Sequence, residues 1–229
     1  MAILRIGHRG ACGYEPENTL RSFKKALELG ADMIELDVHL CKTGELVVIH
    51  DETVDRTTDG KGYVDTKTVS ELKQLDAGKG EKIPLLKEVF DLIQRKAKIN
   101  VELKGERTAK PVIGLIEEYV DHKGWSYDDF LISSSRLEEL SEAVKINRGI
   151  KMGLLPSRSV ADLIESATAL RAYSVHPHLK MVTEEFVETT HHKGMKVFVW
   201  TVNRLKEIQR MKSFKVDGIF SDYPDRLSH

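Results

Sequence analysis

The chain has 229 residues, of which 41% are hydrophobic and 31% are charged, as is ordinary for one α/β barrel or two small globular domains. A formal net charge of −1 argues against a broad binding surface for nucleic acid or anionic membrane, so an anionic ligand must be bound locally. The two cysteines, Cys12 and Cys41, are too few for a disulfide framework and are interpreted as free thiols. The sequence shows neither a signal-peptide pattern nor a membrane span, and we expect a reducing, cytoplasmic compartment.

Strands and helices alternate along almost the whole chain. The predicted strands cover residues 3–7, 33–39, 99–103, 130–133, 151–155, 172–175, 197–200 and 218–221. The predicted helices cover residues 18–29, 85–96, 111–122, 137–147, 160–170, 184–193 and 205–212. Eight strands separated by helices predict an α/β fold of the (β/α)8 TIM barrel type. A doubly wound open sheet is the alternative, and the lack of a Gly-rich dinucleotide turn disfavours it.

Residues 51–82 interrupt this alternation. They are rich in turn formers such as Asp59, Gly60 and Gly62, and only residues 69–75 are weakly helical. Long segments of this kind in compact domains usually have a function. We therefore expect one domain over residues 1–229, in which residues 51–82 form a small inserted cap subdomain after the second strand.

The second strand has one apolar and one polar face. Ile34, Leu36 and Val38 alternate with Glu35, Asp37 and His39, so both carboxylates point the same way, about 7 Å apart. Such a pair is stabilised by a hard divalent cation, whereas a solvated edge strand is the plainer reading. Residues 42–45 form a turn and residues 46–49 return toward the strand, which brings His50 within reach of the acidic face.

Polar residues also end other strands. Asn100, Glu102 and Lys104 share the inward face of their strand, and functional groups in TIM barrels gather at the C-terminal strand ends. Glu35, Asp37 and Glu102 together therefore predict an oxygen site for one divalent cation. Taken singly, Glu102 could simply pair with Lys104 or with a neighbouring strand, and Trp200 could be core packing. The remaining histidines of interest are interpreted as incidental, namely His176, His178, His191 and His192.

The predicted site suits a narrow chemistry. A cation, Arg9 and Lys104 would neutralise a phosphate anion, and His8 and His50 would supply a general acid and a general base near neutral pH. The sequence contains no nucleophile elbow and no P-loop. The residues therefore indicate phosphodiester cleavage assisted by one metal ion.

An ordered set of motifs makes the chain recognisable along its whole length. The motifs are His8-Arg9-Gly10, Pro16-Glu17-Asn18-Thr19, Glu35-Leu36-Asp37-Val38, Val48-Ile49-His50-Asp51, Asp55-Arg56-Thr57-Thr58, Val101-Glu102-Leu103-Lys104, Trp200-Thr201-Val202-Asn203, Asp217-Gly218 and Ser221-Asp222-Tyr223-Pro224. In these motifs the chain resembles the bacterial glycerophosphodiester phosphodiesterases, whose barrel is similar to that of phosphatidylinositol-specific phospholipase C. One departure is Ser133-Ser134-Ser135-Arg136, where relatives often have an aromatic residue after the serine pair.

The resemblance implies hydrolysis of glycerophosphocholine, glycerophosphoethanolamine and similar small molecules to sn-glycerol 3-phosphate and an alcohol, through a cyclic phosphate. It also implies roles for the residues found above: Glu35, Asp37 and Glu102 would bind Mg²⁺ or Ca²⁺, His8 and His50 would be the acid/base pair, Arg9 and Lys104 would hold the phosphate, and Trp200 would pack on the glycerol.

Two alternatives stay open at the level of the sequence. One is a lysophospholipase D-type phosphodiesterase on the same fold, which would need an apolar surface for the acyl chain. The other is a non-catalytic phosphate-binding barrel, which would have no need of two histidines. The residues do not distinguish Mg²⁺ from Ca²⁺, and they fix neither the preferred alcohol nor the oligomeric state.

Overall fold

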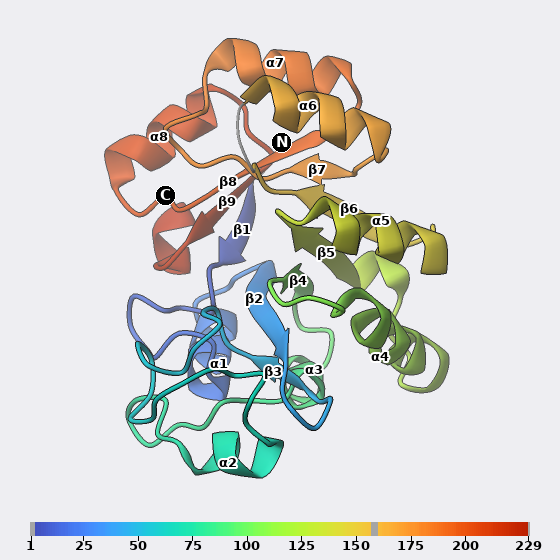
Figure 1. Cartoon of the computed structure of the whole chain (residues 1–229). Helices are drawn as coiled ribbons and strands as arrows, with labels where there is room; N and C mark the ends of the chain where they lie inside the picture. The colour runs from blue at the N-terminus through green and yellow to red at the C-terminus, as the bar shows by residue number, and fades with distance from the viewer. Residues whose placement is uncertain (1–2, 157–159, 229) are drawn as a thin grey trace.

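The computed structural model describes residues 3–156 and 160–228, and in them the strands form a closed barrel (Figure 1). The sheet has nine strands, and all of its pairs are parallel except that of β2 with β3. Because β1 pairs with both β2 and β9, the eight parallel strands close on themselves. These strands are β1 (Leu4–Gly7), β2 (Met33–Leu40), β4 (Lys98–Leu103), β5 (Phe130–Ser134), β6 (Lys151–Leu154), β7 (Ser174–Val175), β8 (Lys196–Val199) and β9 (Gly218–Ser221). The predicted TIM barrel is confirmed, and the open-sheet alternative is wrong.

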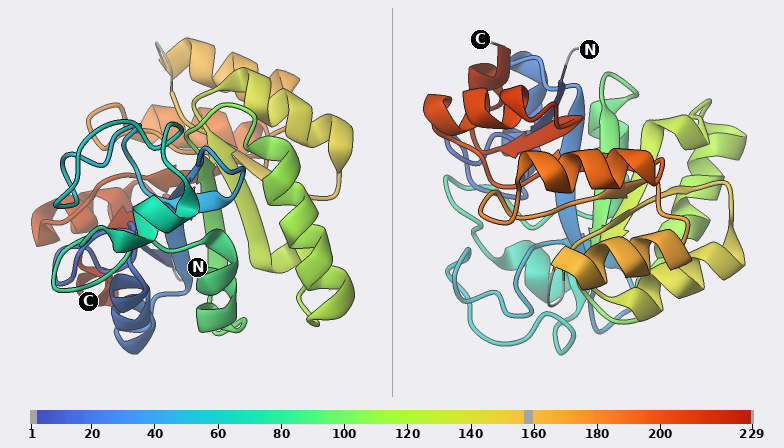
Figure 2. Two further views of the ribbon diagram at one scale, coloured as in Figure 1. Left: turned by 60° about the horizontal axis from the view of Figure 1, so that its bottom comes forward. Right: turned by 90° about the horizontal axis from the view of Figure 1, so that it is seen from above.

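Helices follow the strands and pack around the outside of the barrel (Figure 2). They are α1 (Leu20–Glu28), α3 (Leu86–Ile93), α4 (Ala109–His122), α5 (Leu137–Ile146), α6 (Val160–Ala169), α7 (Glu184–His192) and α8 (Leu205–Ser213). Helix α1 begins two residues later than predicted, because the Thr19 hydroxyl accepts a hydrogen bond from the Ser22 backbone N–H at 3.2 Å and caps the helix. Within the described residues, no helix is both long and apolar enough to cross a membrane.

The core has two layers, one between the strands and the helices and one inside the barrel. Alternate residues of each strand point into one layer or the other. Outward-facing residues such as Ile34, Leu36 and Val38 are fully buried in the layer between strands and helices. The barrel interior is apolar only in part, where five buried side chains cluster: Ile6, Met33, Leu131, Phe198 and Phe220. On β2 the inward face continues from Met33 to Glu35 and Asp37, so the acidic residues lie nearer the C-terminal end of the barrel.

The segment after β2 forms a lobe beside the barrel mouth (Figure 1). Strand β3 (Leu46–Val48) pairs antiparallel with β2, as the predicted return of residues 46–49 requires. Helix α2 (Val69–Gln74) is fixed by a capping box between Thr68 and Glu71. The lobe has its own small apolar cluster of Cys41, Val47, Ile49, Val54, Val64, Leu72, Ala77 and Ile83. Residues 51–82 thus pack on this cluster with little regular secondary structure of their own.

Candidate active site

A pocket opens at the C-terminal ends of the strands and gathers residues that lie far apart in the sequence. It is lined by seven of the eight predicted site residues, namely His8, Arg9, Glu35, His50, Glu102, Lys104 and Trp200. The eighth, Asp37, is 1% exposed and lies beneath the lining, with its carboxylate 3.4 Å from Arg9 Nε. Other side chains in the lining are Asn100, Leu155, His176, Thr201 and Phe220. The sequence therefore identified most of the polar wall of this pocket.

Three buried carboxylates form the base of the pocket. Glu35 and Asp37 come from β2, and Glu102 lies opposite Asp37 on β4. One oxygen of each lies within 4.8 Å of the others, and all three residues are less than a tenth exposed. Burial, together with the charge of Asp37, raises the pKa of Glu35 to about 8, and burial also raises the pKa of Glu102.

Each of these carboxylates accepts a hydrogen bond from one group of the protein. The Arg9 backbone N–H donates to Glu35 at 2.7 Å, the Asn18 amide donates to Asp37 at 2.9 Å, and Lys104 Nζ donates to Glu102 at 3.1 Å. Three anions at this spacing in a buried site repel one another, whereas oxygen ligands in this arrangement can hold a hard divalent cation. The three carboxylates therefore fit Mg²⁺ or Ca²⁺ as oxygen ligands.

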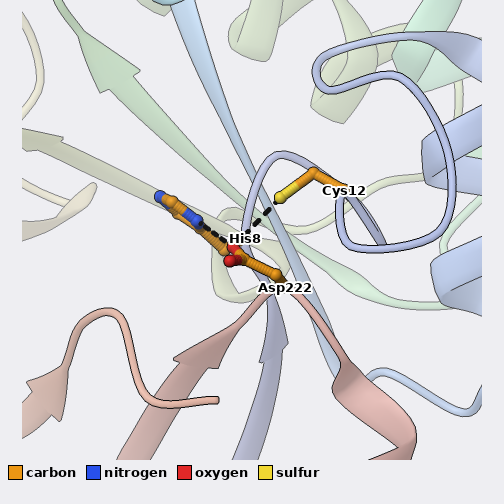
Figure 3. A group of neighbouring side chains, drawn as sticks. All are labelled: His8, Cys12 and Asp222. Carbon is orange, nitrogen blue, oxygen red and sulfur yellow. Dashed lines mark hydrogen bonds and ion pairs between the residues drawn. The ribbon is translucent and has the colours of Figure 1, made fainter.

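Two histidines face this pocket, and each is oriented by a carboxylate. Nδ1 of His8 lies 2.7 Å from Asp222 Oδ1, and Nδ1 of His50 lies 2.6 Å from Asp51 Oδ1. Figure 3 shows the second ring nitrogen of His8 pointing away from Asp222. Because Nδ1 is held in each ring, Nε2 is the nitrogen that is available to a bound substrate.

The two imidazoles differ in their electrostatic surroundings. Burial lowers the pKa of His8, but the hydrogen bond to Asp222 and the charge of Glu35 outweigh it, so that the pKa lies above its ordinary value. For His50 burial dominates the attraction of Asp37 and Asp51, so its pKa lies below the ordinary value. One histidine is thus biased toward the protonated form and the other toward the neutral form, as an acid/base pair requires.

The inserted lobe contributes a charge network to the rim. Arg56 donates to Glu17 at 2.7 and 2.8 Å and to Asp51 at 2.7 Å, and Glu17 also accepts from Arg9 at 2.7 Å. This network connects the carboxylate that orients His50 to the guanidinium at the pocket wall. Sequence reasoning gave Glu17 and Arg56 no role, although both belong to the quoted motifs.

Asp51, Asp222 and Asn18 also lie near the site, and sequence reasoning gave them no role either. The sequence could have pointed to them, because each belongs to one of the quoted motifs. Asp51 follows His50 directly, whereas Asp222 is 214 residues from His8, and only the pairing of β1 with β9 brings the two together.

Among the other histidines considered in the sequence, only His176 lines this pocket within the described residues. His176 does line the pocket, but burial lowers its pKa to about 3, so it is neutral near pH 7. Its backbone carbonyl accepts a 2.7 Å hydrogen bond from Trp200 Nε1, which fixes the indole at the pocket edge. His178 packs edge-on against Trp200, and His191 bonds to Asp217 on the outside of the barrel.

Comparisons with known proteins agree with the geometry. A family model described as "Glycerophosphoryl diester phosphodiesterase family" matches residues 8–226. A glycerophosphodiester phosphodiesterase of Caldanaerobacter subterraneus subsp. tengcongensis is 43% identical over 99% of this chain and 97% of its own length. A solved Oleispira antarctica phosphodiesterase in complex with the product sn-glycerol-3-phosphate is 31% identical, with a TM-score of 0.89 over 97% of this chain and 94% of that chain. The chain therefore belongs to the glycerophosphoryl diester phosphodiesterase family of enzymes, as its motifs predict.

Proposed function

We propose that this enzyme hydrolyses small glycerophosphodiesters, such as glycerophosphocholine and glycerophosphoethanolamine, to sn-glycerol 3-phosphate and an alcohol. The observation that supports this most directly is the pairing of two carboxylate-held histidines with three buried carboxylates in one pocket. The solved relative from Oleispira antarctica holds sn-glycerol-3-phosphate, the product expected of this reaction.

We assign the cation to Glu35, Asp37 and Glu102, and it would supply positive charge to the phosphate oxygens when bound. Arg9 and Lys104 add two further positive charges at the wall of the same pocket. Each pairs with a carboxylate, Arg9 with Glu17 and Lys104 with Glu102, which holds both cations in place at this wall. Trp200 at the pocket edge offers an apolar face on which the glycerol carbons can pack.

His8 and His50 provide the proton transfers. In the first step a glycerol hydroxyl attacks phosphorus and loses its proton to one histidine, while the alcohol leaves with a proton from the other. Water then opens the cyclic phosphate. The histidine that gave up its proton now takes one from the water, and the other returns its proton to the glycerol oxygen, so each ends the cycle as it began. Asp222 and Asp51 act as positioning residues, because they hold Nδ1 of each ring and thereby direct Nε2 to the substrate.

The inserted lobe favours a small polar substrate over a lysophospholipid. Among residues 51–82, Tyr63 is the one large apolar side chain that is exposed, at 57%. A single aromatic ring offers too little apolar area for an acyl chain. We propose that residues 51–82 act as a polar cap subdomain, which closes one side of the pocket through Arg56.

The test is release of glycerol 3-phosphate from glycerophosphocholine by the His8→Ala and His50→Ala variants. We expect each to lose about 10²- to 10⁴-fold in kcat, the usual contribution of a general acid or base, with unchanged circular dichroism. His122→Ala is the control, because His122 is exposed at the end of α4. Activity should also vanish in EDTA and return with Mg²⁺ or Ca²⁺. Near-normal turnover in either variant contradicts the assignment of the histidines, whereas metal binding with no turnover in the wild type favours a phosphate-binding barrel.

A further inference from the structure

A second group of metal-ligating side chains lies beside the pocket. Asp222 Oδ1 is 2.7 Å from His8 Nδ1 and accepts a hydrogen bond from Cys12 Sγ at 3.0 Å. One ligand atom from each of the three residues lies within 4.8 Å of the others. Figure 3 shows the imidazole and the thiol directed at the same carboxylate. The three side chains come from the loop after β1 and from the end of β9.

The chemistry of this group differs from that of the three carboxylates. It offers one sulfur, one nitrogen and one oxygen, a mixture that borderline and soft cations such as Zn²⁺ and Cd²⁺ accept, whereas Mg²⁺ and Ca²⁺ prefer oxygen alone. Bonds of about 2.0–2.3 Å to a tetrahedral ion need ligand atoms roughly 3.2–3.6 Å apart, so the two pairs that Asp222 makes, with His8 and with Cys12, have to open by less than about 1 Å. The His8 and Asp222 side chains are 17% and 25% exposed, which leaves an entry path for the ion.

We propose that His8, Cys12 and Asp222 form a site for a thiophilic divalent cation such as Zn²⁺ or Cd²⁺, and that its occupation inhibits the enzyme. The Cys12 thiol releases its proton to solvent, and the resulting thiolate and the Asp222 carboxylate balance the two positive charges. Burial and the charge of Asp222 raise the pKa of Cys12, so the ion must displace that proton, and binding strengthens as pH rises.

The ion inhibits by fixing the position of the proton on the His8 ring. The inhibitory effect therefore rests on the proposed function, in which His8 transfers a proton. An ion on Nδ1 leaves the ring proton on Nε2, the nitrogen that faces the substrate. That nitrogen then cannot accept a proton, and a neutral N–H is a far weaker acid than an imidazolium. Occupation of the site therefore blocks His8 whether it acts as the base or as the acid.

The chain provides a matched control, because its second cysteine has no such surroundings. Cys41 is buried, and its thiol contacts Thr43 and Glu45 with no histidine in the group. The probe is Cd²⁺, whose bond to a thiolate gives an ultraviolet charge-transfer absorption that needs no turnover. We expect this band in the wild-type protein and in Cys41→Ser, and its loss in both Cys12→Ser and Cys12→Ala.

Activity is measured in parallel with Mg²⁺ in excess, so that the three carboxylates are already occupied. Cd²⁺ should inhibit the wild type and Cys41→Ser, and it should not inhibit the two Cys12 variants, whose activity without Cd²⁺ should stay near that of the wild type. Absence of the Cys12-dependent band overturns the site, even in a protein with no phosphodiesterase activity. A band without inhibition, or inhibition that persists in the Cys12 variants, overturns the inhibitory role.

Discussion

Asp222 holds the position of the His8 ring through a set of contacts that an amide cannot reproduce. Its Oδ1 faces His8 Nδ1 at 2.7 Å, and its Oδ2 accepts a 2.6 Å hydrogen bond from Asn203 Nδ2. In Asp222→Asn the amide oxygen has to stay at the Oδ2 position to accept from Asn203, which turns the amide N–H toward His8. Two donors cannot face each other, so Nδ1 must become an acceptor and the ring proton moves to Nε2.

The expected loss follows from the strength of that hydrogen bond. A hydrogen bond to a charged group contributes about 1.5–3 kcal/mol, and each ~1.4 kcal/mol is a factor of ten in rate. We therefore expect kcat/KM to fall about 10- to 100-fold. Because burial alone lowers the pKa of His8 and Asp222 raises it, the pKa must fall in the variant. In the proposed acid/base pair, His8 has the raised pKa and would set the alkaline limb of the pH profile, which should then move to lower pH.

The assay is kcat/KM for glycerophosphocholine across the pH range, in excess metal. The acid limb, which follows the lowered pKa of His50, should stay in place and serves as an internal reference. Asp225→Asn is the matched control, because this half-buried carboxylate accepts only from the hydroxyl of Tyr14 among its described side-chain hydrogen bonds. A change below about threefold with an unmoved alkaline limb would refute the positioning role of Asp222.

Three further results are expected. Asp51→Asn removes an interaction that raises the pKa of His50, so the acid limb should move to lower pH with a fall in kcat/KM, and a shift of the alkaline limb instead would contradict this. Asn18→Gly keeps the left-handed backbone (φ 56°) but removes the donor to Asp37, so calorimetry should show Mg²⁺ or Ca²⁺ affinity lowered about 10- to 100-fold, and unchanged affinity would count against it. The pKa of Glu35, about 8 in the metal-free fold, means that folding takes up a proton between pH 4.5 and 8, so the Tm in EDTA should fall as pH rises through this range. Glu35→Gln should flatten that dependence, and an equally steep dependence in the variant would show that Glu35 is not its source.

Local sequence patterns determined much of the architecture. The alternation of helices and strands follows from the short-range periodicity of apolar residues, so the count and order of the barrel strands were predictable. The same periodicity placed Glu35, Asp37 and Glu102 on inward faces, because successive strand residues point to opposite sides. Element ends were less predictable where a side chain decides them, as the Thr19 cap of α1 shows.

Only the tertiary structure decided which groups act on one another. The Asp222 carboxylate reaches His8 and Cys12 because the last strand closes the barrel against the first, across a separation of 214 residues. The Arg56 guanidinium reaches Glu17 and Asp51 because the inserted lobe folds back onto the rim. Periodicity is a local property, whereas ion pairs, pKa shifts and ligand geometry depend on distances between segments that the fold brings together. Most of the polar residues that line the pocket were therefore identifiable from the sequence, but the orientation and charge of its histidines were not.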